Sequence, residues 1–181
     1  PYKNTCVFAF AETNDPHVQG MYFIPEKEDG YMRDRCIFSD QINIEDTMSV
    51  AVRYKEGALL TYSLVTYSPY EGWKIAFTGT KGRLEAASYH TGDRASEDSD
   101  YVKFFNDRGE VITYKMPKAG GTHAGGDVRL LEMLIRGNMP DPLGQIADVR
   151  AGINSVMIGA CANMSIADGK PHRIDDYIHW T

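Results

Sequence analysis

Residues 73–86, Trp-Lys-Ile-Ala-Phe-Thr-Gly-Thr-Lys-Gly-Arg-Leu-Glu-Ala, decide the fold that the sequence predicts. Trp73, Ile75 and Phe77 alternate with polar or small residues, which is the two-residue period of a β-strand. A glycine-containing turn follows, and residues 83–86 return as the next strand. Two such runs joined by a short glycine-containing connection predict an antiparallel hairpin.

The same period continues on both sides of this hairpin. Upstream, residues 47–54 and 60–64 alternate around a Lys-Glu-Gly turn, and downstream residues 101–105 and 111–115 flank an Asn-Asp-Arg-Gly turn. The polar residues 90–100 separate the last two hairpins as a loop. Antiparallel hairpins in series form a meandering sheet that needs no βαβ crossover.

The last third of the chain changes to a helical period. Val128, Leu131 and Leu134 fall on one face of a helix that Gly137 ends, and a longer helix is predicted over about 146–167. A run of strands followed by helices predicts an α+β domain. We expect an open, mostly antiparallel sheet with helices packed on one face.

Composition and charge narrow the classes of function. The chain has 181 residues, 43% of them hydrophobic, and a formal net charge of −6. An acidic chain argues against nucleic acid or an anionic membrane as the main partner. No stretch approaches the roughly 20 apolar residues that a membrane-spanning helix needs.

The length suits one domain, and we expect it to be preceded by a connecting arm. Residues 1–44 mix aromatic and turn residues without a clean period, and we interpret them as a connecting arm with room for one short strand; residues 45–181 form the sheet and helices. The chain begins at a proline, so we expect it to be one piece of a longer protein. Three widely spaced cysteines predict free thiols in a reducing, cytoplasmic setting; the alternative is a Cys6–Cys36 disulfide.

A glycine-rich run at 119–127 joins the last strand to the first helix and contains the first candidate site residues. His123 is a candidate acid, base or hydrogen-bond donor toward substrate, and Asp127 is a candidate helix cap or substrate contact. The alternative is a flexible loop in which Asp127 acts only as the cap. The run lacks the pattern of a Walker or dinucleotide loop, and two candidate ligands are too few for zinc, so we predict no metal.

Aromatic residues give the second candidate group. Tyr67, Tyr70 and Trp73 cluster around Ser68-Pro69, and aromatic rings with polar tips suit the faces of sugars or polyols. For Trp73 the alternative is an ordinary strand aromatic in the core. The residues alone show no complete catalytic constellation, and we assign no catalytic residue.

Several segments together resemble the C-terminal domain of the glucose–fructose oxidoreductase, inositol dehydrogenase and rhizopine-catabolism (Gfo/Idh/MocA) family. The resemblance rests on residues 44–54, 57–64 and 73–86, on the His-Ala-Gly-Gly-Asp loop at 123–127, and on 151–166 with the Gly-Lys-Pro that follows. Phe-Thr-Gly-Thr-Lys-Gly-Arg-Leu-Glu looks like the family's strand–turn–strand signature. The order and spacing of the segments carry the match over about residues 33–178.

The resemblance implies a longer enzyme whose upstream Rossmann domain binds NAD or NADP and carries the family's lysine in a Glu-Lys-Pro-type motif. This chain has no such motif, and its Asp/His spacings depart from the family's Asp-x-x-x-His: Asp15 and His17 are too close, and His123 precedes Asp127. The resemblance therefore implies a substrate-binding and oligomerisation domain, without bound cofactor and inactive alone. It implies a sugar or polyol substrate and a homodimer or higher homo-oligomer through the sheet.

Two other functions stay open at this point. Some relatives use the cofactor transiently to cleave glycosidic bonds, so a cofactor-assisted glycoside hydrolase domain is one alternative. The other is a non-catalytic carbohydrate-binding or assembly module with no Rossmann domain upstream.

Overall fold

The computed structural model describes residues 5–10, 14–118, 120–137 and 139–179. The chain divides into two compact units, Pro1–Asp46 and Thr47–Thr181. The start of the predicted arm and Ala119 of the predicted glycine-rich run lie outside the described residues.

The first unit is built from short helical turns. These are α1 (Pro16–Val18), η1 (Gln19–Phe23) and α2 (Glu26–Asp29). The Asp15 carboxylate caps α1 by accepting hydrogen bonds from the backbone N–H groups of His17 and Val18, at 2.7 and 3.1 Å. The described part of this unit contains helical turns and no strand, where the sequence left room for one short strand. An aspartate cap followed by proline starts a helix rather than a strand.

Aromatic rings hold this first unit together. Phe8 meets Phe38 edge to face with ring centroids 5.5 Å apart. The Arg33 guanidinium lies over two rings, 5.2 Å from the centroid of Phe10 and 5.0 Å from that of Tyr22. Each such cation–π contact contributes roughly 0.5–1 kcal/mol at an exposed site.

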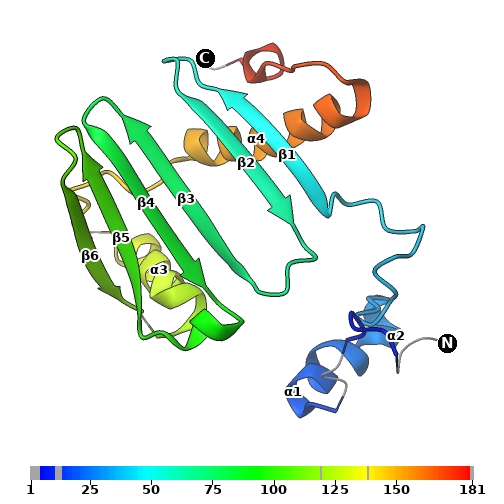
Figure 1. The fold of residues 1–181 in the computed structure, drawn as a ribbon. Helices are drawn as coiled ribbons and strands as arrows, with labels where there is room; N and C mark the ends of the chain where they lie inside the picture. The colour runs from blue at the N-terminus through cyan, green and yellow to red at the C-terminus, as the bar shows by residue number, and fades with distance from the viewer. Residues whose placement is uncertain (1–4, 11–13, 119, 138, 180–181) are drawn as a thin grey trace. The chain divides into compact units, whose positions relative to one another are not determined.

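The second unit contains two antiparallel sheets (Figure 1). A two-stranded sheet pairs β1 (Thr47–Arg53) with β2 (Leu59–Val65), and a four-stranded sheet has the order β3 (Gly72–Gly79), β4 (Gly82–Tyr89), β5 (Ser99–Asn106), β6 (Val111–Pro117). The α+β class and the antiparallel hairpins are therefore confirmed. Among the described residues no ladder joins β2 to β3. The connection between them contains Pro69, which has no N–H to donate to a ladder.

Two helices follow the sheet. The first, α3 (Gly126–Arg136), ends at Gly137, whose φ of +69° is the left-handed conformation that glycine adopts readily. The second, α4 (Val149–Asp168), begins three residues later than predicted because Asp148 caps it by accepting a hydrogen bond from the Ala151 N–H at 2.7 Å. None of the described helices combines the length and apolar content needed to cross a bilayer.

The register gives the four-stranded sheet two chemically different faces. Because Phe77 lies opposite Leu84, and Leu84 opposite Phe104, the alternate residues of all four strands collect on one apolar face. This apolar face consists of Trp73, Ile75, Phe77, Leu84, Val102, Phe104, Ile112, Tyr114 and Met116. Its edge-strand members are 42–59% exposed. The opposite face carries charged and tyrosine side chains.

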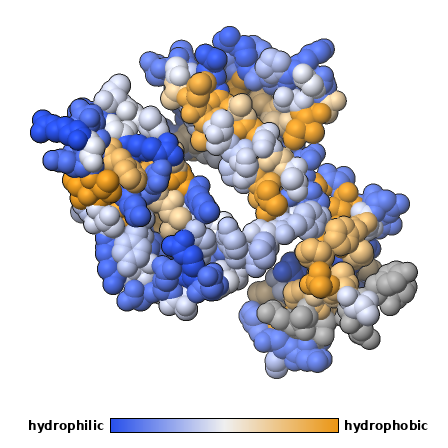
Figure 2. Space-filling model, viewed as in Figure 1, coloured by the Kyte–Doolittle hydropathy of each residue, from blue (hydrophilic) through white to orange (hydrophobic). Residues whose placement is uncertain are grey.

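Much of the apolar surface of the chain remains accessible. Only Val18 and Cys161 are buried hydrophobic residues among those described. On α3, Leu134 and Ile135 are 71% and 79% exposed. Figure 2 shows apolar residues at the surface beside hydrophilic ones. All three cysteines are free thiols, so the alternative Cys6–Cys36 disulfide is absent.

Candidate functional site

A histidine–aspartate pair lies where the glycine-rich loop enters α3. The Nδ1 atom of His123 is 2.9 and 2.8 Å from the two carboxylate oxygens of Asp127. A carboxylate oxygen only accepts hydrogen bonds, so Nδ1 carries the hydrogen of the neutral imidazole. The lone pair is then left on Nε2. The His123 side chain is 84% exposed, so its Nε2 can exchange a proton or a hydrogen bond with an incoming hydroxyl group.

The pair corrects the predicted role of Asp127 as helix cap. The N-cap of α3 is Gly125, without any side-chain capping bond, and the helix begins at Gly126. Asp127 therefore lies inside the first turn, where its negative charge is favoured by the helix dipole. Its carboxylate turns back to His123 because the preceding turn, η3 (Thr122–Gly125), brings the imidazole within reach.

The backbone that presents His123 is strained. His123 has a φ of +48° and Ala124 a φ of +54°, and they are the only non-glycine residues with positive φ in the described part of the chain. A left-handed conformation costs an L residue roughly 1–2 kcal/mol. Strain of this kind concentrates at functional sites, where the surrounding structure over-determines the conformation. It supports His123 as a site residue.

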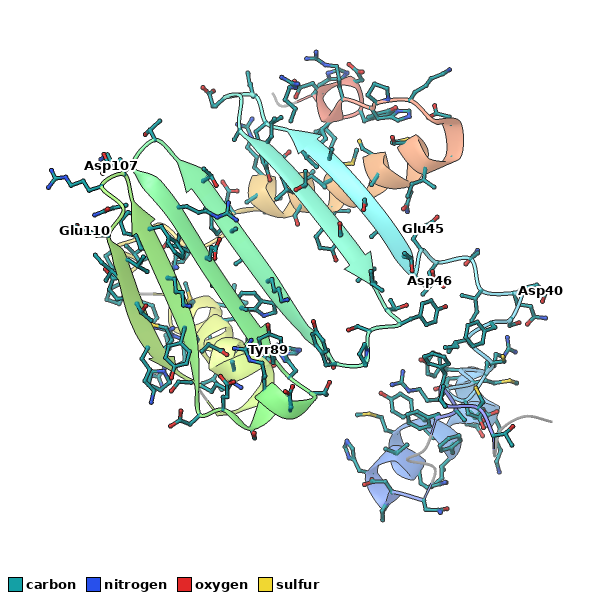
Figure 3. All side chains as sticks on the ribbon, viewed as in Figure 1. Asp40, Glu45, Asp46, Tyr89, Asp107 and Glu110 are labelled. Atoms are coloured by element: carbon teal, nitrogen blue, oxygen red, sulfur yellow. The ribbon has the colours of Figure 1, made fainter. Side chains whose placement is uncertain are left out.

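The three aromatic candidates lie in three different places. Tyr70 packs against Tyr89 with ring centroids 5.6 Å apart, and the Arg94 guanidinium lies 4.2 Å from the Tyr89 centroid. Figure 3 labels Tyr89 at the end of β4, from which the chain continues into η2 (Asp93–Ser96). Trp73 lies on the apolar face of β3, whereas Tyr89 lies on the opposite face. Tyr67 is half-buried in the connection between β2 and β3.

The arginine in this stack is fixed from two sides. Arg94 donates from Nε to the Glu97 carboxylate at 3.1 Å. That hydrogen bond, with the nearby Tyr89, raises the pKa of Arg94 above its ordinary value. The predicted loop at 90–100 therefore contains an ordered cationic group that the sequence analysis missed. No spacing rule connects an arginine to a tyrosine five residues earlier across a loop.

The structure thus gives two separate groups of contacts, one around His123 and one around Tyr89. The part of the chain that the structure describes holds no cluster of three or more His, Cys, Asp or Glu side chains arranged for a metal ion. The arrangement around His123 suits hydrogen bonding and proton exchange with hydroxyl groups. The Tyr70–Tyr89–Arg94 stack offers flat rings and a fixed cation.

Comparison with known proteins places these features in context. A family model described as the C-terminal alpha/beta domain of an oxidoreductase family, Gfo/Idh/MocA, matches residues 4–174. The chain is 38% identical over 149 residues to a protein named "Putative oxidoreductase YteT" from Bacillus subtilis (strain 168). The match covers 78% of this chain and 34% of that relative, so the chain spans about a third of its length. No solved structure matches the chain significantly.

Proposed function

Because this chain belongs to the Gfo/Idh/MocA oxidoreductase family, as its C-terminal alpha/beta domain, we propose that it is the substrate-binding and oligomerisation domain of an NAD(P)-dependent oxidoreductase. The substrate is a sugar or polyol, and the protein is cytoplasmic. The dinucleotide binds upstream of this chain, and a hydride passes between a substrate carbinol carbon and the nicotinamide. The chain by itself holds no cofactor and does not turn over.

The observation that carries the substrate assignment is the His123–Asp127 pair. A carboxylate that fixes the imidazole tautomer leaves one ring nitrogen for a substrate hydroxyl, and the strained loop holds that nitrogen in the open. Substrate hydroxyl groups that change protonation during oxidation need such a partner. Tyr67 and Tyr70 are proposed as further substrate contacts through their rings. Trp73, the third aromatic candidate, lies with Phe77 on the apolar face of the sheet and is proposed for the oligomer interface instead.

The oligomerisation role is proposed for the apolar face of the β3–β6 sheet. Phe77 is 59% exposed and Trp73 is 50% exposed on this face. Burying apolar area contributes about 25 cal/mol per Å², which favours covering such a face with protein. A second copy meeting it through the sheet produces a homodimer with a self-complementary interface. Light scattering that finds only monomers of the whole enzyme contradicts this proposal.

The experiment that tests the function uses the whole oxidoreductase that contains this chain. Reduction of NAD and NADP is followed with a panel of sugars and polyols, and the products are identified. We expect cofactor reduction with at least one member of the panel. Cleavage of a glycosidic bond without net cofactor reduction supports the glycoside hydrolase alternative instead. Absence of any dinucleotide binding contradicts the proposal and supports the non-catalytic module.

Substitution of the pair tests its role in substrate binding. His123→Gln and Asp127→Asn are expected to raise KM or lower kcat/KM by about tenfold or more, since each removes a hydrogen bond to a polar partner. The matched control is His90→Gln, because His90 is an exposed histidine at the end of β4 whose described hydrogen bond uses its backbone N–H. Equal kinetics for His123→Gln and the control contradict the assignment.

A further inference from the structure

The charged face of the four-stranded sheet contains a hollow whose lining includes Tyr89 and Arg94 of the stack described above, together with residues to which the proposed function gives no role. Its volume is about 750 Å³, within the range of roughly 300–1,000 Å³ found for small-molecule sites. Ala76 and Ala87 are among its lining residues, and their short side chains leave room. Lys74, Lys103 and Tyr101 rise around them from neighbouring strands.

The acidic side chains around this hollow are already engaged. Glu85 accepts from Arg83 Nε at 2.6 Å, and Glu97 accepts from Arg94 Nε at 3.1 Å. Asp100, which also lines the hollow, accepts from the Ser88 hydroxyl at 2.8 Å. The anions near the hollow therefore have local partners.

The two lysines differ from these groups. Lys74 and Lys103 are exposed, and within the described ranges neither has a carboxylate at ion-pair distance. Lys103 lies directly opposite Glu85 in the register, yet Glu85 is held by Arg83 on its own strand. Two uncompensated ammonium groups beside an alanine-lined hollow are notable in a chain whose net charge is −6. A ligand that complements the two ammonium groups is therefore an anion.

The sheet geometry lets both lysines reach one group. Lys74 pairs with Ala87 on β4, and Lys103 with Glu85 two residues earlier on the same strand. With strands about 4.8 Å apart and about 3.4 Å per residue, the two Cα atoms are about 12 Å apart. Extended lysine side chains of roughly 6 Å each can place both ammonium groups around a single oxyanion between them.

We propose that the hollow between Lys74 and Lys103 is a binding site for a small hydroxylated anion, with its carboxylate or phosphate group held by the two ammonium groups. The hydroxyl groups of Tyr101 and Thr113, which also line the hollow, are available to the hydroxyl groups of such a ligand. The site lies on the sheet face opposite Trp73, and its occupancy does not depend on hydride transfer.

Calorimetric titration of the whole protein tests the site directly. The probes are inorganic phosphate, a hexose phosphate and a hexuronate, with the neutral hexose as the comparison. We expect an anionic probe to bind at millimolar or lower concentration, more weakly as salt is added because exposed charges are screened. Preference for the hexose phosphate or for the hexuronate identifies the anionic group. If inorganic phosphate binds as tightly as the hexose phosphate or the hexuronate, the hydroxyl groups of the ligand contribute nothing to binding. That result overturns the part of the proposal that concerns those hydroxyl groups.

Charge-removing variants locate the binding. Lys74→Met and Lys103→Met replace the lysine with an unbranched, uncharged side chain one atom shorter. Each is expected to weaken binding about tenfold, since a hydrogen bond to a charged group is lost. Lys103→Arg keeps the charge and is expected to retain binding. The matched control is Lys81→Met in the β3–β4 turn, which keeps full affinity.

Three results overturn the proposal. The first is the absence of binding heat with every probe. The second is equal binding of the neutral hexose, and the third is a loss of affinity in Lys81→Met equal to that in Lys74→Met. A variant with an unfolded circular dichroism spectrum is replaced by Ala87→Leu, which fills the hollow without changing charge and is also expected to abolish binding.

Discussion

The turn between β3 and β4 offers a sharp test of the sheet geometry, because its two glycines occupy opposite positions with very different surroundings. Gly79 and Gly82 pair with each other in the register. A Cβ atom on Gly82 overlaps the carbonyl oxygen of Phe105 and lies 3.0 Å from the Cα of Asn106. A Cβ atom on Gly79 has no heavy atom within 4 Å.

The backbone adds to the difference between the two sites. Gly82 has a φ of +135°, which L side chains rarely adopt, whereas Gly79 has no positive φ. Gly82→Ala is expected to cost about 1–3 kcal/mol in backbone strain and about 1–3 kcal/mol from the overlap with neighbouring backbone. A total of about 2–6 kcal/mol is a large part of the roughly 5–15 kcal/mol that stabilises a typical domain.

Gly79→Ala is the matched control in the same turn. It is expected to change the unfolding free energy by about 0.5–1 kcal/mol at most, in the stabilising direction, because alanine reduces the entropy of the unfolded chain. The free energies of unfolding of both variants are measured by urea denaturation with circular dichroism. Equal stability of Gly82→Ala and Gly79→Ala refutes the register of β4 against β5 at this end of the sheet.

Three further predictions concern α4 and the segments that flank it. Asp148→Ala removes the N-cap of α4 and is expected to cost about 1 kcal/mol in urea denaturation; an unchanged midpoint contradicts this cap. Hydrogen bonds from backbone N–H groups lower the pKa of Asp141 and, with His172, of Asp168. The stabilising effect of these two carboxylates is complete above the ordinary carboxyl pKa and disappears as the pH falls through the lowered pKa values. The free energy of unfolding is therefore expected to fall in acid. A free energy of unfolding that does not change with pH in this range contradicts the prediction. His172 contacts Asp168 at 3.1 Å and the Tyr177 hydroxyl at 2.6 Å. Tyr177→Phe removes the second contact and is expected to speed amide hydrogen exchange at the end of α4. Unchanged exchange rates contradict a stabilising role for the His172–Tyr177 contact.

The period-two pattern predicted the four-stranded sheet well, because each strand alternates apolar and polar residues. The hairpin at residues 73–86 has the predicted pairing, with Phe77 opposite Leu84. The pattern did not predict that β1 and β2 form a separate sheet, since alternation within a strand carries no information about its neighbours. It also missed the helical turns of residues 16–29, which are too short to show a helical period.

The candidate site was harder to predict than the fold. The sequence singled out His123 and Asp127 but favoured a capping role for the aspartate, because Asp before an apolar helical run is a common N-cap signal. The contact between them depends on positive φ at His123 and Ala124, which sequence rules assign to glycine. Tyr89 and Arg94 were missed because their contact forms across a loop, where no period applies.

The order β3-β4-β5-β6 leaves one long side of β3 without a hydrogen-bonded neighbour in the described structure. An unpaired strand edge can form backbone hydrogen bonds with another extended segment. Proteins prevent this pairing with proline or with inward-facing charged residues at the edge. β6, at the other side, ends in Pro117 and carries Lys115. β3 also carries one lysine, Lys74, but unlike β6 it contains no proline. Fibril or precipitate formation by the separated chain is therefore expected to begin along β3, and a lysine in place of Ile75 is the change that protects it.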